Sequence, residues 1–253
     1  MGSIFYKDQG KGPTIILLHG FCETHQIWDG FAEELAKEFR VITPDLPGFG
    51  KSDLPTQPFS IYDIGRQMVD WVSYLKIASP VVIGHSLGGY VTLEMAKISK
   101  SLFSGIGLFH STPFADSEEK KINRDKTIGF VQRHGIELFV KSFVPELFYQ
   151  KNHPKLTFVK ELALKTPINT FLGYTQAMKE RPTSENFIQN IGSYLMILSG
   201  IYDLVIPHQN SIEAAILAKT AIFKPLEDTG HMGMFESSND ALAAIVDFRI
   251  HRM

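Results

Sequence analysis

The chain has 253 residues, of which 44% are hydrophobic, and a formal net charge of −2. This length and apolar content suffice for one large domain, or for a domain with an insertion, and exclude disordered and fibrous proteins. Lysine and arginine are spread along the chain without a basic cluster. The charge pattern therefore indicates neither a nucleic acid nor an anionic membrane as partner, and a small molecule fits better.

The first ten residues lack the features of a secretory leader, and no apolar run approaches the roughly 18 residues that span a membrane. We therefore expect a cytoplasmic protein without a membrane segment. The single cysteine, Cys22, excludes an intrachain disulfide and a metal site built from several cysteines. The sequence leaves the oligomeric state open between monomer and dimer.

The N-terminal part reads as strand, helix and strand. Residues 4–6 and 14–18 are β-rich runs separated by a glycine-containing turn, and the second run is apolar throughout, as in a strand buried on both faces. Residues 27–39 carry apolar side chains at helical spacing and lead into a strand over residues 40–43. This order predicts the beginning of a parallel βαβ arrangement.

The loop after this strand is rich in glycine and proline and ends in Gly50-Lys51-Ser52, which invites comparison with a phosphate-binding loop. Such a loop needs a further glycine at position 45, where this sequence has Asp45, and a strand that runs directly into it. We therefore do not predict a nucleotide site here.

A helix predicted over residues 61–75 leads into a strand that runs directly into Ser86, in the motif Gly84-His85-Ser86-Leu87-Gly88. Small neighbours permit a sharp strand-to-helix turn that exposes the serine oxygen. The helix that begins there points N–H groups toward the place where an oxyanion develops. Because the motif also occurs by chance, and serine is a common helix cap, the motif alone leaves open whether Ser86 is a nucleophile.

After a buried strand over residues 105–109, the alternation of strands and helices stops. From about residue 112 to residue 190 we find only helical periodicity, in segments 117–133, 136–143, 154–165 and 167–179. This block predicts a helical layer inserted into a core made of residues 1–111 and 191–253. The core resumes with two strands and two helices, over residues 193–198, 207–218, 221–223 and 239–248.

A serine nucleophile needs a base and an acid that orients the base, and in a parallel sheet these lie on loops at the carboxyl ends of strands. Asp203 follows the strand that ends at residue 198, and His231 follows the last strand. Asp228 is the alternative acid, but it lies three residues before His231 and fits the turn. We predict Ser86 as nucleophile, Asp203 as acid and His231 as base, in the chain order that this architecture uses.

The oxyanion donors are expected to be the backbone N–H groups of Leu87 and of Phe21, which lies in the loop after His19. The Phe21 side chain is at the same time a candidate core aromatic. His19 and His85 are interpreted as structural. Cys22 lacks a nucleophile turn and is expected to be a buried or pocket-lining thiol.

Taken together, these motifs resemble the α/β-hydrolase superfamily over essentially the whole chain. They are His19-Gly20-Phe21, the loop over residues 45–52, the turn around Ser86, Gly200-Ile201-Tyr202-Asp203 with Pro207, and Gly230-His231. The resemblance implies an α/β fold with a doubly wound, mostly parallel eight-stranded sheet, and it makes residues 112–190 a helical cap over the site. A serine nucleophile argues against the dehalogenases and epoxide hydrolases of the superfamily, which use aspartate, so the chain looks like a small carboxylesterase.

The expected reaction is hydrolysis of carboxylic esters of small or apolar acyl or aromatic substrates through an acyl-enzyme, which needs no cofactor and no metal. The partner is then a small-molecule ester, and the aromatic residues expected near its pocket, besides Phe21, are Trp28, Phe130, Phe139, Phe143 and Phe148. Two alternatives remain open. One is perhydrolase or haloperoxidase-like activity on the same triad, and the other is a slow-turnover ligand-binding receptor of this fold.

Overall fold

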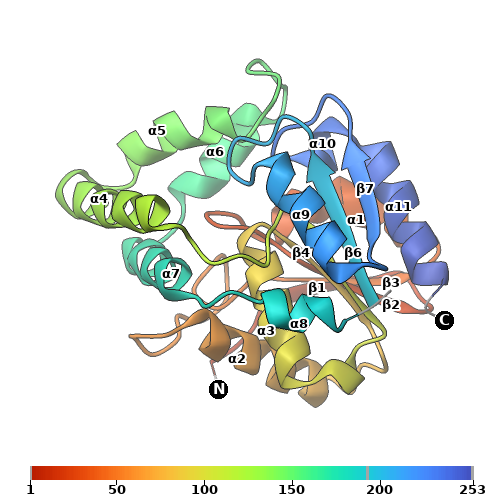
Figure 1. Cartoon of the computed structure of the whole chain (residues 1–253). Coiled ribbons are helices and arrows are strands. Elements are labelled where there is room, and N and C mark those ends of the chain that lie inside the picture. Colours follow the sequence, from red (N-terminus) through yellow and green to blue (C-terminus); the bar gives the residue numbers. More distant parts are fainter. Residues whose placement is uncertain (1, 192–193, 252–253) are drawn as a thin grey trace.

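The computed structural model describes residues 2–191 and 194–251. At its centre, in the described residues, is a seven-stranded sheet of order β1-β3-β2-β4-β5-β6-β7 (Figure 1). β1 pairs antiparallel with β3, and the other pairings are parallel. The strands are β1 (Tyr6–Gln9), β2 (Thr14–Leu18), β3 (Arg40–Pro44), β4 (Val81–His85), β5 (Gly105–Phe109), β6 (Leu195–Gly200) and β7 (Ile222–Leu226).

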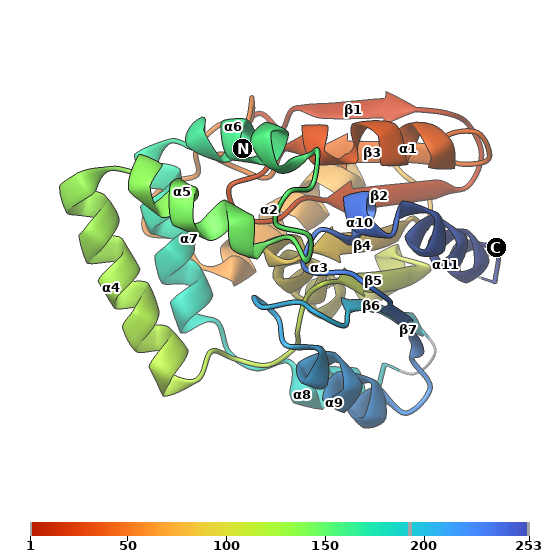
Figure 2. The same cartoon turned by 90° about the horizontal axis from the view of Figure 1, so that it is seen from above.

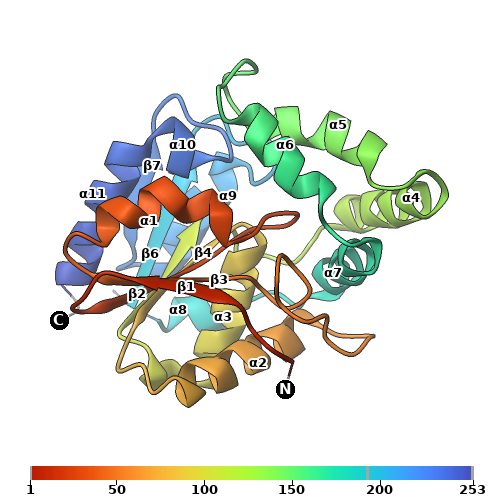
Figure 3. The ribbon, with the colours of Figure 1, turned by 180° about the vertical axis from the view of Figure 1, so that it is seen from behind.

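Helices cover both faces of the sheet because its central strands are apolar on both sides. In β2, Ile15 and Leu17 belong to the cluster that includes α1 (Asp29–Leu35) and α11 (Ser238–Ile250). The alternate residues Ile16 and Leu18 belong to the cluster that includes α2 (Ile61–Tyr74) and α3 (Leu87–Ile98). Figure 3 shows α1 and α11 on one side of the sheet and α2 and α3 on the other. The predicted doubly wound α/β fold is confirmed.

The strand number differs from the eight that the resemblance implies. The described residues contain seven strands. The strand predicted from residue 193 begins at Leu195, and residue 193 itself lies outside the described residues.

Between β5 and β6 the chain forms the helices α4 (Glu118–His134), α5 (Glu137–Glu146), α6 (Leu156–Leu164), α7 (Ile168–Glu180) and α8 (Glu185–Gln189). Helices α4 to α7 lie beside the sheet as a separate group, on the side toward which the parallel strands point (Figures 1 and 2). Two hydrogen bonds fix α7 to the glycine-rich loop: Thr170 Oγ1 donates to Gly48 O (2.8 Å) and Tyr174 Oη to Pro47 O (2.8 Å). The short helix α8 packs instead against α9 (His208–Ala218).

Helix ends follow ordinary capping chemistry. α2 begins with a capping box, in which Ser60 and Asp63 exchange hydrogen bonds between side chain and backbone. α4 begins after Ser117, whose hydroxyl accepts from the Lys120 N–H, and ends at Gly135, which has a φ of 76°. The helices that periodicity did not predict are too short to display it: His25–Trp28, Lys100–Leu102, α8 and α10 (Gly233–Glu236). No helix in the described part of the chain is both long and apolar enough to cross a membrane.

Candidate active site

Ser86 occupies the sharp turn between β4 and α3, with φ 51° and ψ −115°. This is a strained conformation for a residue with a side chain, and it costs roughly 1–2 kcal/mol. Two neighbours hold it in place: the Ser86 N–H donates to Phe109 O (2.9 Å), and Ser111 Oγ donates to Ser86 O (2.7 Å). The strain is therefore supported by β5 and by the residues that follow it.

The turn requires glycine on both sides of the serine. A Cβ at Gly84 would lie 2.1 Å from Gly88 O, and a Cβ at Gly88 would lie 2.6 Å from Leu18 O. Both distances are far below van der Waals contact with backbone atoms that cannot move independently. The glycines thus let β4, the start of α3 and the end of β2 meet at the serine.

Asp203 and His231 are brought together from two loops at the same edge of the sheet. His231 Nδ1 donates to Asp203 Oδ2 (2.7 Å), and Asp203 Oδ1 accepts from the N–H groups of Val205 (2.8 Å) and Ile206 (2.9 Å). Burial by itself would raise the pKa of Asp203. The charges and hydrogen bonds of His231 and His110 outweigh it and hold that pKa well below its usual value. An ionised Asp203 fixes the proton of His231 on Nδ1 and leaves Nε2 as the basic atom.

A second buried histidine contacts the same carboxylate. His110 directly follows β5, with a φ of 49°, and its Nδ1 lies 3.3 Å from Asp203 Oδ2. Backbone N–H groups face both ring nitrogens: Gly200 N lies 3.1 Å from Nδ1, and Gly233 N lies 3.1 Å from Nε2. Burial lowers the pKa of His110 to about 4, and the ring is neutral at pH 7. His110 therefore supports the orientation of Asp203 without adding a charge.

A buried ion pair joins the loop after β2 to the loop that carries His231. Glu23 Oε2 accepts from the Gly20 N–H and from His85 Nδ1 (3.0 Å), and His85 Nε2 donates to the backbone oxygen of His231 (2.8 Å). Both ring nitrogens of His85 face oxygen acceptors, so the ring is protonated.

The pKa shifts agree with this pairing. Burial raises the pKa of Glu23, but His85 and the Gly20 N–H outweigh it, and the pKa lies below its usual value. Burial lowers the pKa of His85, but Glu23 and the His231 carbonyl outweigh it, and the pKa lies above its usual value. The pair is ionic and ties two parts of the site together.

The two predicted oxyanion donors come from the start of α3 and from the turn after β2, and Phe21 lines the same cavity as Ser86. Leu87 is the first residue of α3, so its N–H is one of the unpaired groups at a helix start. Phe21 lies in the turn after β2, where His19 holds the backbone: His19 Nε2 accepts from the Leu46 N–H (2.9 Å), and its Nδ1 contacts Gly20 O (2.8 Å). Cys22, the next residue, is buried, and burial raises the pKa of its thiol, so it is not a thiolate nucleophile.

A cavity of about 260 Å³ opens at Ser86. Most of its wall is aromatic or aliphatic, with a few polar groups. The lining residues are Phe21, Ser86, Tyr90, Arg124, Thr127, Phe139, Phe143, Thr175, Met178 and Val205. The structure therefore brings the predicted residues Phe21, Phe139 and Phe143 together with Ser86.

Three aromatic residues predicted for the pocket do not line this cavity. Trp28 is fully buried in the core, Phe148 is 1% exposed and stacks on His153 (5.0 Å between ring centroids), and Phe130 packs on His134 (4.9 Å). The sequence pattern places an aromatic side chain on the inner face of its element. It does not tell whether that face meets the sheet, another helix or a cavity. Trp28 and Phe130 thus lie away from the cavity at Ser86, and Phe148 lines a separate pocket together with Asp203.

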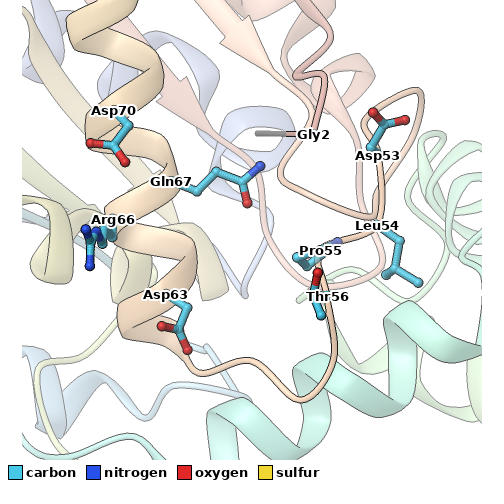
Figure 4. Close-up of a pocket in the computed structure, with 9 residues that line it drawn as sticks. All are labelled: Gly2, Asp53, Leu54, Pro55, Thr56, Asp63, Arg66, Gln67 and Asp70. Atoms are coloured by element: carbon cyan, nitrogen blue, oxygen red, sulfur yellow. The ribbon is translucent and has the colours of Figure 1, made fainter.

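A larger hollow of about 750 Å³ lies on the surface between α2 and the loop before it. Figure 4 shows Asp63, Arg66, Gln67 and Asp70 on α2, with Gln67 extending toward the loop that carries residues 53–56. This hollow shares no lining residue with the cavity at Ser86. None of Ser86, Asp203 and His231 borders it.

His110, Asp203 and His231 are the described side chains whose potential metal ligands lie close together, within 4.8 Å of one another. Hydrogen bonds already use His231 Nδ1, Asp203 Oδ2 and both ring nitrogens of His110. The three side chains therefore suit a hydrogen-bonded network.

Sequence reasoning missed Glu23, His110 and the polar part of the cavity wall. His110 carried a usable signal, because it follows a buried strand directly, at the same edge as Ser86 and Asp203. Glu23 carried none, since its partner His85 is 62 residues away.

The chain belongs to the alpha/beta hydrolase family, whose model matches residues 15–245. It is similar to a thermophilic esterase from Thermogutta terrifontis, solved with malate bound (TM-score 0.93, 26% identity, 100% of this chain and 95% of the other). An enol-lactonase from Burkholderia xenovorans shares the fold (TM-score 0.89, 21% identity, 98% and 96%).

Curated relatives match over shorter segments. A soluble epoxide hydrolase of Corynebacterium is 32% identical over 108 residues, which are 43% of this chain and 38% of the relative. An uncharacterized protein of Mycobacterium tuberculosis is 40% identical over 91 residues, which are 36% of this chain. That match spans about a quarter (27%) of the relative's length.

Proposed function

We propose that this hydrolase cleaves carboxylic esters with small or apolar acyl or aromatic groups, using Ser86 as nucleophile, His231 as base and Asp203 as the acid that orients the base. The observation that carries the proposal is the buried hydrogen bond between His231 and Asp203 (2.7 Å), at the same edge of the sheet as a strained serine that opens into a mostly apolar cavity. Similarity to the Thermogutta terrifontis esterase supports ester hydrolysis.

In this mechanism, Ser86 Oγ attacks the ester carbonyl while His231 Nε2 takes its proton. Asp203, already ionised, stabilises the imidazolium that forms. The N–H groups of Leu87 and Phe21 bind the oxyanion of the tetrahedral intermediate. His231 then protonates the leaving alcohol, which departs and leaves the acyl group on Ser86. A water molecule activated by His231 releases the acid and restores the serine.

We propose that the helical segment within residues 112–190 serves as a cap, because α4, α5 and α7 supply most of the cavity wall outside the core. A volume of about 260 Å³ favours a short acyl chain or a single ring over a long fatty acid. The triad needs neither a metal nor a cofactor for this chemistry.

The test is hydrolysis of p-nitrophenyl acetate and butyrate by the wild type and by Ser86→Ala, with the exposed Ser73→Ala on α2 as control. We expect Ser86→Ala to lose activity by about four to six orders of magnitude and Ser73→Ala to keep it. A phosphonate that labels serine nucleophiles should add its mass to the peptide that contains Ser86 in the wild type only. Full activity of Ser86→Ala, or absence of hydrolysis by the wild type, would refute the proposal.

A further inference from the structure

One part of the cavity wall is cationic. Arg124, on α4, lines the cavity, and its Nε donates to Asp116 Oδ2. The other oxygen of Asp116 accepts from Arg181 Nη1 (2.8 Å). A single buried carboxylate therefore serves two guanidinium groups, which stay charged at every accessible pH.

A third basic side chain, that of Lys120, lies near Arg124. Lys120 is one helical turn before Arg124, and its Nζ donates to the backbone oxygen of Val205 (3.3 Å), a cavity residue. Burial lowers the pKa of Lys120, and the neighbouring Arg181 and Arg124 lower it further, against the attraction of Asp116 and Asp203. Since Asp203 is paired with His231, this group of side chains carries an excess of positive charge.

Arg181 is accounted for within the fold. Besides Asp116 it donates to the backbone oxygens of Met178 and Phe114, and its guanidinium lies 3.9 Å from the ring centroid of Tyr90. Arg124 differs. In the described part of the chain its recorded hydrogen bond is the one from Nε, which leaves both Nη groups without a protein acceptor, and its side chain is only 23% exposed.

The two Nη groups of Arg124, half-buried at the edge of an apolar cavity, are complementary to a carboxylate group of a ligand. Two parallel N–H groups fit two carboxylate oxygens, and the low polarity of the surroundings strengthens the pair. The alternative, a cavity filled by a neutral ligand, leaves the Nη groups partly desolvated and without an acceptor, which is unfavourable. Arg124 and Ser86 border the same small cavity, so one short molecule can contact both.

We propose that the substrate is an ester that also carries a carboxylate, which Arg124 binds through its Nη groups while the ester carbonyl lies at Ser86. This rests on the proposed esterase function and adds the charge of the substrate to it. Phe21, Phe139 and Phe143 then hold the apolar part between the two ends. Arg124 acts here as a specificity-determining residue, not as part of the chemical step.

The test compares esters that differ in charge and share their acyl chain. Hydrolysis of monomethyl and dimethyl succinate, glutarate and adipate is followed by acid release at constant pH, which gives kcat/KM for each. A second series places the carboxylate on the alcohol side, as 2-acetoxyacetate and 3-acetoxypropionate against their methyl esters. The two series tell which end of the substrate reaches Arg124.

For the wild type we expect at least one length at which the anionic ester is preferred about tenfold or more over its neutral partner. Arg124→Gln should reduce this preference about 10- to 100-fold, as expected for loss of a charge-assisted hydrogen bond. Arg124→Lys keeps the charge without the fork and should fall between the two. Arg133→Gln, at an exposed position of the same helix, should keep the wild-type preference. Thermal melts identify any variant that fails to fold.

Three outcomes decide the inference. One outcome is that the wild type hydrolyses the neutral ester better at every chain length, with the ratio of kcat/KM between anionic and neutral esters unchanged in Arg124→Gln. In that case the carboxylate proposal is wrong while the esterase proposal stands. If no ester is hydrolysed, the esterase proposal fails, and monomethyl glutarate is titrated calorimetrically into Ser86→Ala. Saturable binding that disappears in Ser86→Ala/Arg124→Gln supports the anion site, and equal binding or none by both refutes it.

Discussion

Replacing Glu23 by Gln removes the negative charge from the buried pair that joins Gly20, His85 and the loop of His231. The pair is almost completely excluded from water, with side chains 4% and 0% exposed for Glu23 and His85. A single atom, Glu23 Oε2, accepts both from the Gly20 N–H and from His85 Nδ1. A glutamine side chain can offer either an oxygen or an amide nitrogen at that position, but not both.

The glutamine variant therefore leaves one buried group without a partner. With the amide oxygen in place, Gly20 keeps its acceptor and His85 remains a buried cation without a counter-charge. With the nitrogen in place, His85 becomes neutral and accepts, and the Gly20 N–H is unpaired. An unsatisfied buried polar group costs about 1–3 kcal/mol, and an unpaired buried charge costs about 3–5 kcal/mol. The range of about 1–3 kcal/mol applies here, because the His85 ring can lose its proton and so avoid an unpaired buried charge.

We expect Glu23→Gln to lower the free energy of unfolding by about 2 kcal/mol and the melting temperature by roughly 4–8 °C. Because Gly20 precedes the proposed donor Phe21, kcat for p-nitrophenyl butyrate should fall more than KM changes. Urea unfolding and steady-state kinetics measure both, with the exposed Glu33→Gln on α1 as a control for the lost charge. A variant within 0.5 kcal/mol of the wild type and with unchanged kcat would show that the pair does not hold the site.

Three further predictions concern the pH profile, the serine turn and the cavity. Because the pKa of His110 is lowered to about 4, the unfolded chain binds more protons than the native one between about pH 4 and 6.5. The unfolding free energy should thus fall by roughly 2–3 kcal/mol as the pH drops through this range. The fall should be smaller in His110→Asn, a variant chosen because asparagine tolerates the positive φ at this position. An equal fall in the two proteins, measured by urea unfolding at several pH values, would contradict this. Gly88→Ala places a Cβ 2.6 Å from Leu18 O, so we expect loss of more than about 4 kcal/mol, and a wild-type melting temperature would disprove the turn geometry. Phe139→Ala should shift the preferred p-nitrophenyl ester to longer acyl chains. Trp28→Ala should lower the free energy of unfolding by about 3–5 kcal/mol without changing the preferred chain length. The same chain-length profile in both variants would contradict the assignment of Phe139 to the substrate pocket and of Trp28 to the core.

The sequence alone determined the fold class and the places from which Ser86, Asp203 and His231 project. Local apolar runs predict buried strands. Because the carboxyl ends of parallel strands lie at the same edge of the sheet, a residue directly after a strand can be assigned to that edge. Only the tertiary structure decided what surrounds these residues. The contact between Glu23 and His85 spans 62 positions, and that between Asp116 and Arg181 spans 65. Such pairs depend on how helices and loops pack, and hydrophobic periodicity tells which face a side chain occupies but not what that face meets.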